Sequence, residues 1–493
     1  LGIMAGAAVA EMNVASTALV NASRGLGISA TLLPIAAGAL SILCGATVVS
    51  SGMAADRIGR RRMLIIGLLI GIAADLVTAA SFSPWVYIVA RAIVGISVGI
   101  VFTSSFATVK AVAAEGQLGN GLGIFGAVAG TTTLFVSFVG GSLASADWRL
   151  TFLVIPVIYA IALVFVPRLV PVQPRVASGP IDLVGQVLLA LGIIGPLYAI
   201  SQMTRSLTAP LTLIPLIAGL AAFAAFIVWE RRTPHPFFPV RIFTSPMFIA
   251  GVLFGVGFNL SNSTMVLQLA NLWQYLRHMD TVQVACAQLP ALIIGIIASV
   301  IAGRLLSGGW HERRLGTLGF ILVVLGFGSL ALYRQDASFW IFIPGLLLIG
   351  AGAQALNVPF GSLVIKSAPP DALGPVTASR SAIGSISNAL GMAGATVVID
   401  RLTEGGLIDR LTKAGVPPLD RGQALDAVTI YMKTEQEPAT TLAREALHSA
   451  GPSYANAFAT TMGIVAVLMA VMAVGAFLLL RPRQASDART PAG

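Results

Sequence analysis

The sequence predicts an all-α membrane protein with 14 transmembrane helices, and its composition carries that prediction together with the spacing of its apolar segments. Of the 493 residues, 56% are hydrophobic and only 10% are charged, and the mean hydropathy is +0.88. Soluble globular domains carry about 25% charged residues, so a soluble fold is excluded. The net charge of +10 does not indicate nucleic-acid binding here, because short basic loops between apolar segments are what membrane topology requires.

Apolar windows mark the spanning helices, because a helix needs about 20 apolar residues to cross a bilayer. An even number of spans places both ends of the chain on one side of the membrane. If the seventh and eighth spans are an insert, six helices remain on either side, as in transporters built from two pseudo-symmetric bundles (6+2+6). The windows lie near residues 1–22, 30–52, 63–82, 84–109, 118–144, 150–167, 181–203, 210–229, 246–272, 281–306, 315–333, 338–361, 373–399 and 456–480.

Lys and Arg are unevenly divided between alternate loops, which sets the orientation. One set of loops, which includes residues 57–62, holds most of them and is therefore expected in the cytoplasm, together with both termini. One outer loop is long, residues 400–455. We expect a solvated connector with short helices there, and a cap over the outer mouth is the alternative. The opposite short loops hold only Arg24, Arg149, Arg205, Arg277 and Arg334.

A charged turn, residues 52–62, separates the second and third apolar windows. A charged residue at the centre of a spanning helix costs roughly 2.5–3.5 kcal/mol, so this turn must lie at a membrane surface. Glycine near each end lets the backbone turn sharply. Asp56 is expected near the start of the next helix, where a negative charge is favoured. From the residues alone, an ordinary positively charged loop is an equal alternative.

The turn resembles the loop between helices 2 and 3 of the major facilitator superfamily, whose pattern is G-x-L-A-D-R-x-G-R-[RK]. Only Ala54 departs from it, in place of the leucine. The resemblance implies a gating loop that latches two bundles together when the central cavity faces outward. Its members are Gly52, Asp56, Arg57, Gly59, Arg60 and Arg61.

Further motifs resemble the fourteen-helix drug:proton antiporter branch of this superfamily. Residues 230–243 are similar to the connector after its helix 8, and Asp182 with Gly185 to the opening of its extra helix 7. Matches also occur at 140–152 and 374–391. The resemblance implies a first six-helix bundle at 1–167, two extra helices with cytoplasmic connectors at 168–243, a second bundle at 244–480 that includes the 400–455 loop, and a cytoplasmic tail at 481–493.

Glu11 is the sharpest candidate for proton coupling. It lies midway along the first window, where an ionised carboxylate is expensive and is expected to face a cavity or a partner. Such an acid is suited to binding and releasing a proton. When the first window is aligned on Ala18 and Leu19, Glu11 falls where the resembling family has the acid of L-D-x-T-I-V-N-V-A-L-P. The alternative is that Glu11 reaches up to the membrane surface.

Arg91 is the second candidate. It begins the pattern Arg91-x-x-x-Gly95-x-x-x-Gly99, which places a cation and two glycines on one helical face and allows close packing. It resembles the R-x-x-Q-G motif of helix 4, with Val94 in place of glutamine. The resemblance implies an arginine that tunes the proton-carrying acid. A static structural pair with Glu11 is the alternative.

Two features limit the resemblance. In the fifth window the antiporter pattern G-x-x-x-G-P-x-x-G-G keeps only Gly140 and Gly141, and the loss of its G-P step puts the direction and stoichiometry of exchange in question. We also expect Asp75 to be interfacial and Asp400 to lie at the edge of its helix. A carrier of dications would need a second deep acid, so monocationic or neutral lipophilic substrates are favoured.

Polar residues on otherwise apolar windows are candidates for lining a substrate cavity, although most amides within membranes simply bond a neighbouring helix. The sequence contains no nucleophile–base constellation, metal-ligand cluster or phosphate-binding loop, so we expect neither an enzyme nor a cofactor or metal. The cavity candidates are Asn13, Thr17, Asn259, Asn262, Gln354, Asn357 and Asn388.

Together these features predict a secondary active transporter that couples proton entry to efflux of lipophilic drugs by alternating access. Its expected partners are a small lipophilic molecule, protons and membrane lipid, without nucleic acid. We expect a monomer in the plasma membrane, the inner membrane of a bacterium. Two alternatives stay open: a carrier for an endogenous metabolite or lipid, and a transport-inactive membrane scaffold or receptor.

Overall fold

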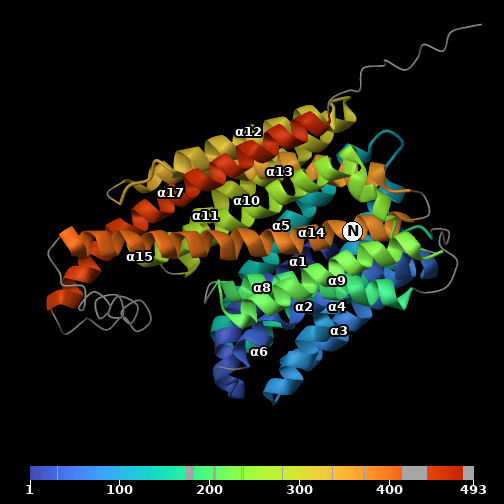
Figure 1. Ribbon diagram of the computed structural model, residues 1–493. Coiled ribbons are helices and arrows are strands. Elements are labelled where there is room, and N and C mark those ends of the chain that lie inside the picture. Colours follow the sequence, from blue (N-terminus) through green and yellow to red (C-terminus); the bar gives the residue numbers. More distant parts are fainter. Residues whose placement is uncertain are drawn as a thin grey trace, which may run out of the picture.

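The computed structural model describes residues 1–29, 32–172, 182–203, 207–234, 236, 238–279, 281–335, 337–369, 372–413 and 441–480. Every regular element in these ranges is a helix, and the long helices lie roughly side by side (Figure 1). Thirteen helices of this part of the chain are long and apolar enough to cross a membrane. The first helix adds a fourteenth segment of 25 residues, apolar over Gly2–Met12. The predicted all-α membrane fold is confirmed.

The first seven helices pack together as an N-terminal bundle. Its core is formed by apolar side chains of five long helices and α7, among them Val14, Leu68 and Val98. The short helix α6 and helix α7 together make one span, as the 150–167 window predicted. The elements are α1 (Gly2–Leu26), α2 (Leu33–Ile58), α3 (Arg60–Ala79), α4 (Pro84–Val112), α5 (Leu118–Ala146), α6 (Trp148–Thr151) and α7 (Val154–Leu169).

Helices α8 (Leu183–Met203) and α9 (Pro210–Arg232) form a hairpin that packs against α2 and α14 (Figure 1). The two helices touch through backbone, since a Cβ on Gly195 would lie 2.4 Å from the carbonyl oxygen of Pro215. The Asp182 carboxylate accepts hydrogen bonds from the Gly185 amide at 2.9 Å and from the Trp229 indole at 3.0 Å. Asp182 therefore holds the start of α8 against the end of α9.

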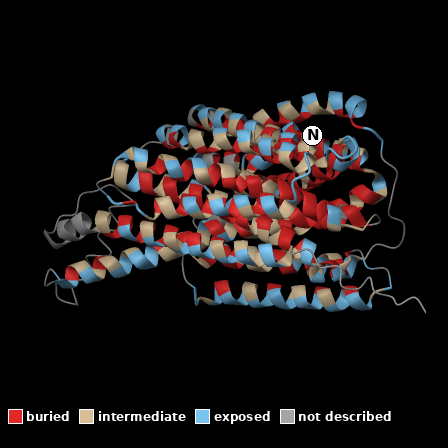
Figure 2. Ribbon diagram, turned by 90° about the horizontal axis from the view of Figure 1, so that it is seen from above, coloured by how far each residue is buried: buried red, intermediate tan, exposed pale blue. Residues whose placement is uncertain are grey.

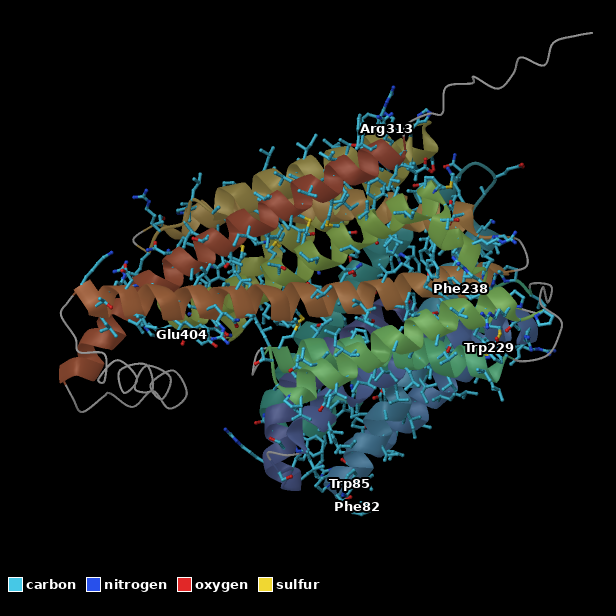
Figure 3. All side chains as sticks on the ribbon, viewed as in Figure 1. Phe82, Trp85, Trp229, Phe238, Arg313 and Glu404 are labelled. Atoms are coloured by element: carbon cyan, nitrogen blue, oxygen red, sulfur yellow. The ribbon has the colours of Figure 1, made fainter. Side chains whose placement is uncertain are left out.

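The remaining helices pack together as a C-terminal bundle, and its aromatic-rich core continues onto α2, α8 and α9. Figure 3 shows Arg313 and Phe238 toward one end of the molecule and Glu404 toward the other. The elements are η1 (Val240–Thr244), α10 (Pro246–Arg277), α11 (Thr281–Ser307), α12 (Glu312–Leu330), η2 (Phe339–Ile341), α13 (Phe342–Ser367), α14 (Leu373–Ala389), the π-helical segment η4 (Leu390–Gly394), α15 (Ala395–Lys413) and α17 (Thr441–Leu479).

Segment 400–455, expected to be a solvated connector with short helices, is helical at both of its described ends. Helix α14 continues through η4 into α15 as far as Lys413, and α17 begins at Thr441, so two spanning helices extend into this region (Figure 1). At 1.5 Å per residue the run from Leu373 to Lys413 is about 60 Å long, about twice the hydrocarbon thickness of about 30 Å. The physical reason is that hydropathy marks where a helix leaves hydrocarbon, not where it ends. Residues 414–440 lie outside the described ranges.

Burial follows the pattern expected for a protein surrounded by lipid. Buried residues gather along the middle of the helix array and exposed residues lie on its outer faces (Figure 2). Those outer faces are rich in large apolar side chains, which a water-soluble monomer does not expose over so large an area. Exposed aromatics lie near helix ends, for example Trp85 and Trp340, as in the aromatic belts of membrane proteins.

The two bundles meet at the end that carries the α2–α3 turn. Helices α5 and α11 cross there through backbone: a Cβ on Gly123 would lie 2.6 Å from the carbonyl oxygen of Ser299 and 2.9 Å from Cα of Gly303. Two hydrogen bonds join the same pair of helices, from the Ser299 hydroxyl to the Gly123 carbonyl at 3.0 Å and from the Asn120 amide to the Ser307 hydroxyl at 2.8 Å. This end of the interface is therefore closed.

Gly123→Ala should open this end, because the added methyl has no room between α5 and α11. Overpacking costs about 1–3 kcal/mol, which shifts a two-state equilibrium about 5- to 150-fold. The measurement is the rate at which a cysteine at Asn120 reacts with a thiol reagent, in a Cys286→Ser background because Cys286 is exposed. Gly130→Ala is the matched control, since its Cβ would meet its nearest neighbour at 3.9 Å. Equal labelling rates in both variants would contradict this account of the closure.

Candidate functional site: a buried ion cluster and an interhelical cavity

Three charged side chains meet in the core of the N-terminal bundle. Arg91 of α4 donates from Nη1 both to Oε1 of Glu11 on α1, in a close ion pair, and to Oδ1 of Asp75 on α3 at 3.3 Å. Its Nη2 also lies 3.5 Å from the backbone carbonyl oxygen of Glu11. Each of the three residues is only 1% exposed. The structure thus brings the two proton-coupling candidates together and adds a second acid.

One alternative and one expectation from the sequence are wrong here. Glu11 does not reach the membrane surface, because it is buried and paired with Arg91. Asp75 is not interfacial, although it lies about one turn from the end of α3. The chain turns back after α3, so Arg91, about two turns into α4, comes level with Asp75 and supplies the partner that makes its burial possible.

Close helix packing holds the cluster in place. A Cβ on Gly95 would lie 2.2 Å from the carbonyl oxygen of Leu40 on α2, so only glycine lets α4 approach α2 this closely. The Ser97 hydroxyl donates to the Gly67 carbonyl of α3 at 2.8 Å. The glycine pattern that follows Arg91 therefore serves the close packing expected of it.

The surroundings of the cluster are apolar and aromatic. The Arg91 guanidinium lies 4.9 Å from the centre of the Phe152 ring, and Phe152 packs edge-on against Tyr87. The buried hydroxyl of Tyr159 has no hydrogen-bond partner in the described part of the chain. Charges interact far more strongly in such a dry setting than in water, so any change in protonation strongly affects the packing around it.

The charged turn is a helix junction rather than a loop. Helix α2 runs to Ile58 and α3 begins at Arg60, with only Gly59 between them at φ +103°. Asp56 therefore lies in the last turn of α2, so its expected position at the start of the next helix is wrong. Its carboxylate pairs with Arg60 at 3.0 Å, and Arg60 also donates to the Ala107 carbonyl of α4 at 3.3 Å.

The other members of the gating loop lie around this ion pair. Gly52 is buried within α2, whereas Arg57 and Arg61 are partly exposed. Asp56 and Arg60 are 3% and 8% exposed, so the pair sits inside the protein and not on its surface. Because the pair links α2, α3 and α4, the charged turn fixes three helices at the closed end of the interface.

Six of the seven cavity candidates divide into three pairs. Asn262 and Gln354 line a small cavity of about 50 Å³ between α5, α10, α11 and α13. Asn259 and Asn388 face each other across α10 and α14 at 3.5 Å. The side chains of Asn13 and Thr17 lie outside the described residues.

Asn357 leads to a residue that the sequence analysis missed. It donates to Gln354 at 3.1 Å and accepts a close hydrogen bond from Arg380 of α14. Arg380 is 8% exposed, and its guanidinium lies 4.2 Å from the centre of the Phe106 ring on α4 and 5.1 Å from that of Phe360. The signal was present, since Arg380 is a charge inside the 373–399 window and the rule applied to Glu11 applies to it equally.

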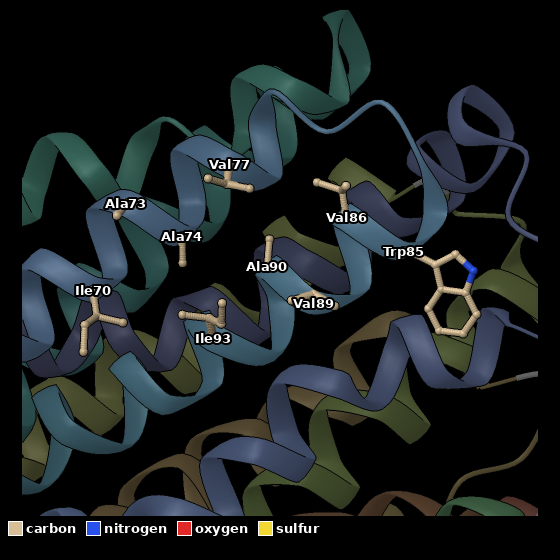
Figure 4. A pocket seen from close by; sticks show the side chains of 9 residues that line it. All are labelled: Ile70, Ala73, Ala74, Val77, Trp85, Val86, Val89, Ala90 and Ile93. Carbon is tan, nitrogen blue, oxygen red and sulfur yellow. The ribbon is translucent and has the colours of Figure 1, made fainter.

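A hollow of about 530 Å³ lies between α3 and α4 and opens outward (Figure 4). Its lining is apolar throughout, so nothing in it orients a polar ligand. Ala74 and Ala90 at its base adjoin Asp75 and Arg91 in sequence, but the side chains of those two point into the bundle. The hollow is lined by Ile70, Ala73, Ala74, Val77, Trp85, Val86, Val89, Ala90 and Ile93.

The fold and these sites define a class, the multi-pass secondary transporters built from two helical bundles. A family model described as Major Facilitator Superfamily matches residues 1–392, and the chain belongs to that family. A solved structure, the human organic anion transporter MFSD10, superimposes with a TM-score of 0.58 at 16% identity, covering 95% of this chain and 98% of that one. At this identity the likeness shows the fold alone.

Curated relatives carry names from drug resistance. The chain is 25% identical over 461 residues to the multidrug resistance protein B homolog of Mycobacterium tuberculosis, covering 91% of this chain and 83% of the relative. It is 26% identical over 420 residues to the puromycin resistance protein pur8 of Streptomyces alboniger, covering 82% and 81%. The chain is thus a membrane transporter of a family whose members are not enzymes.

Removing the arginine should leave the two acids without a counter-charge. Arg91→Ala is expected to cost about 3–5 kcal/mol of stability near neutral pH, as for other buried pairs that lose one partner. Acidic buffer should restore part of this loss, because protonating Glu11 or Asp75 removes the uncompensated charge. The measurement is thermal unfolding in detergent at two pH values.

Arg149→Ala is the control for that experiment. Arg149 is partly exposed and donates to the carbonyl oxygens of Ala79 and Ser81, each at 2.7 Å, and it forms no ion pair with an acid in the described part of the chain. Its loss should be smaller and should not recover at low pH. An Arg91→Ala penalty that is equal at both pH values would show that charge imbalance is not its cause.

Proposed function

We propose that the protein exports lipophilic drugs across the plasma membrane in exchange for protons. The observation that supports this most is the ion pair between Glu11 and Arg91, since an acid buried in a spanning bundle marks a proton or substrate pathway by default. The names of the curated relatives support the drug as cargo. The energy source is the proton gradient, worth about 2.3 kcal/mol per charge for each 100 mV of membrane potential, plus the pH difference.

The N- and C-terminal bundles are the two bodies that rock against each other in this proposal. By the distribution of Lys and Arg, the closed end between α5 and α11 faces the cytoplasm, as do both termini. Opening it admits substrate to the cavity lined by Asn262 and Gln354. The Asp56–Arg60 pair keeps α2, α3 and α4 in register at this end while the bundles are closed, which refines the latch expected of Asp56 and Arg57.

The substrate class is wider than the sequence suggested. The preference for monocationic or neutral molecules rested on the lack of a second deep acid, and Asp75 is such an acid. We therefore include lipophilic cations with one charge or two. The polar residues of the cavity and the aromatic rings around Arg380 suit amphiphilic molecules.

A second candidate is a carrier of an endogenous lipid or metabolite, without exchange. The feature that favours it is α5, which is one continuous helix from Leu118 to Ala146 and lacks the G-P step of the antiporter pattern. The apolar hollow between α3 and α4 also suits an acyl chain. This candidate requires no proton gradient, so transport assays separate it from the first.

In proteoliposomes with an imposed pH gradient, wild-type protein should accumulate a fluorescent lipophilic cation. Glu11→Gln and Arg91→Ala should each reduce this gradient-driven flux at least about tenfold, the scale of losing one functional charge, about 1.4 kcal/mol or more. Glu404→Gln is the matched control, because Glu404 is exposed on α15 and, within the described ranges, forms an ion pair only with neighbouring Arg401. If the wild-type flux does not depend on the pH gradient, the lipid or metabolite carrier is favoured. If the wild-type protein shows no flux, a scaffold or receptor is favoured.

A further inference from the structure

We propose that the coupling group is a pair of carboxyls, Glu11 and Asp75. The two share one proton beside their common partner Arg91, so Asp75 is a second proton-carrying residue. This inference rests on the proposed proton exchange and specifies the residues that perform it. From the sequence, Asp75 was expected at the membrane surface, where it would have no such role.

The geometry makes the two acids one site. Both carboxylates bond the same nitrogen, Nη1 of Arg91, from two different helices. Two oxygens that accept from one nitrogen lie near each other. An ionised carboxylate only accepts hydrogen bonds, so a hydrogen bond between the two carboxyls requires a proton on one of them.

The charge balance favours one bound proton. With both acids ionised, one guanidinium faces two carboxylates and the site carries a net negative charge inside the bundle. A buried charge without a partner is strongly unfavourable, and neighbouring acids avoid it by holding a proton between them. One proton makes the site neutral, whereas Glu11 and Arg91 alone are already neutral without any. Asp75 is therefore the residue that creates the demand for a proton.

Two buried polar atoms beside the pair have no partner among the described residues: Oδ2 of Asp75 and the hydroxyl of Tyr159. Tyr159, on α7, packs against Gly71, one turn before Asp75. Oδ2 of Asp75 can accept the proton. The Tyr159 hydroxyl can donate a hydrogen bond to the pair when both acids are ionised. A purely structural ion pair has no need of either.

The other titratable and charged groups near the pair are few. Tyr87 on α4 interacts with Arg91 and Glu11, and Cys44 on α2 interacts with Tyr159. Arg149 lies about one turn beyond Asp75, on the α3 carbonyls. Both tyrosines and the thiol are neutral at ordinary pH, so the balance is set by the two acids and Arg91.

The exchange cycle then conserves charge. The site takes one proton from outside and is neutral. When a cation enters the cavity from the cytoplasm, its charge replaces that of the proton, which leaves to the cytoplasm and leaves the pair ionised. After the cation is released outside, a new proton neutralises the pair. One positive charge leaves for each proton that enters, so the membrane potential does not contribute to the exchange of a monocation and the pH difference drives it.

The test is proton release on substrate binding, with tetraphenylphosphonium as the lipophilic cation and full-length protein in detergent. A pH indicator dye reports released protons, and calorimetry reports binding. Wild type should release about one proton per cation bound. Asp75→Asn should still bind but release at least about tenfold fewer protons, and its binding should lose its pH dependence. Asp75→Glu should restore the release.

Controls separate this inference from the proposed function and from misfolding. Thr78→Val removes an uncharged hydrogen bond within α3, close to Asp75, and should release protons like wild type. Release of protons by Asp75→Asn at wild-type level and pH dependence would overturn the shared pair and leave Glu11 as the single coupling acid. Binding by wild type without proton release would instead overturn the proposed proton exchange itself.

A spectroscopic measurement does not depend on the neutral variant folding. A protonated carboxyl gives an infrared carbonyl band that an ionised one lacks. If Asp75 holds part of the shared proton, the conservative Asp75→Glu change should shift this band in otherwise intact protein. A band that is the same in wild type and Asp75→Glu would show that Asp75 carries none of the proton.

Discussion

A charge inside a membrane bundle must have a counter-charge, and in this protein that rule concentrates in Arg91. Its guanidinium is the common partner of acids from α1 and α3, so it ties three helices at one point. Gly95 and Gly99 follow Arg91 on the same face of α4. Because they carry no side chain, the helices approach closely enough for the charged side chains to meet. Packing and electrostatics here are two aspects of one constraint, since neither the acids nor the arginine could be buried without the other.

The interface between the bundles is governed by a different rule. Glycine and small hydroxyl residues let α5 and α11 touch through backbone, and Arg380 is held by aromatic faces and an amide, not by an acid. A contact made from backbone and ring faces can part without leaving a new unpaired acid behind. The strong charges lie within the N-terminal bundle, and the surface at which the bundles separate carries weaker interactions that water can replace.

Much of this was predictable from the sequence, and two of the failures share a cause. The fourteen spans followed from hydropathy because the bilayer imposes a length, and Glu11 and Arg91 followed from the cost of charge in hydrocarbon. Asp75 did not, because position along its helix was used in place of depth in the bundle, whereas Arg380 was missed although its charge lies inside a spanning window. Depth depends on which helix packs alongside, and Arg91 opposite Asp75 is a fact of tertiary structure. The end of α15 failed for a similar reason, since hydropathy does not report how far a helix continues in water.

The run from α14 through the π-helical segment into α15 joins the interface to the farthest part of the described chain. Its beginning packs against α2 of the opposite bundle, and its far part packs against α17. A rod of this length behaves as a lever: a tilt of a few degrees at its base sweeps its tip through a much larger arc. The wide turn at Leu390–Gly394 interrupts the regular backbone ladder and is the natural place for such a lever to flex. Rocking of the bundles would therefore move the far end of α15 by more than the residues near the substrate cavity.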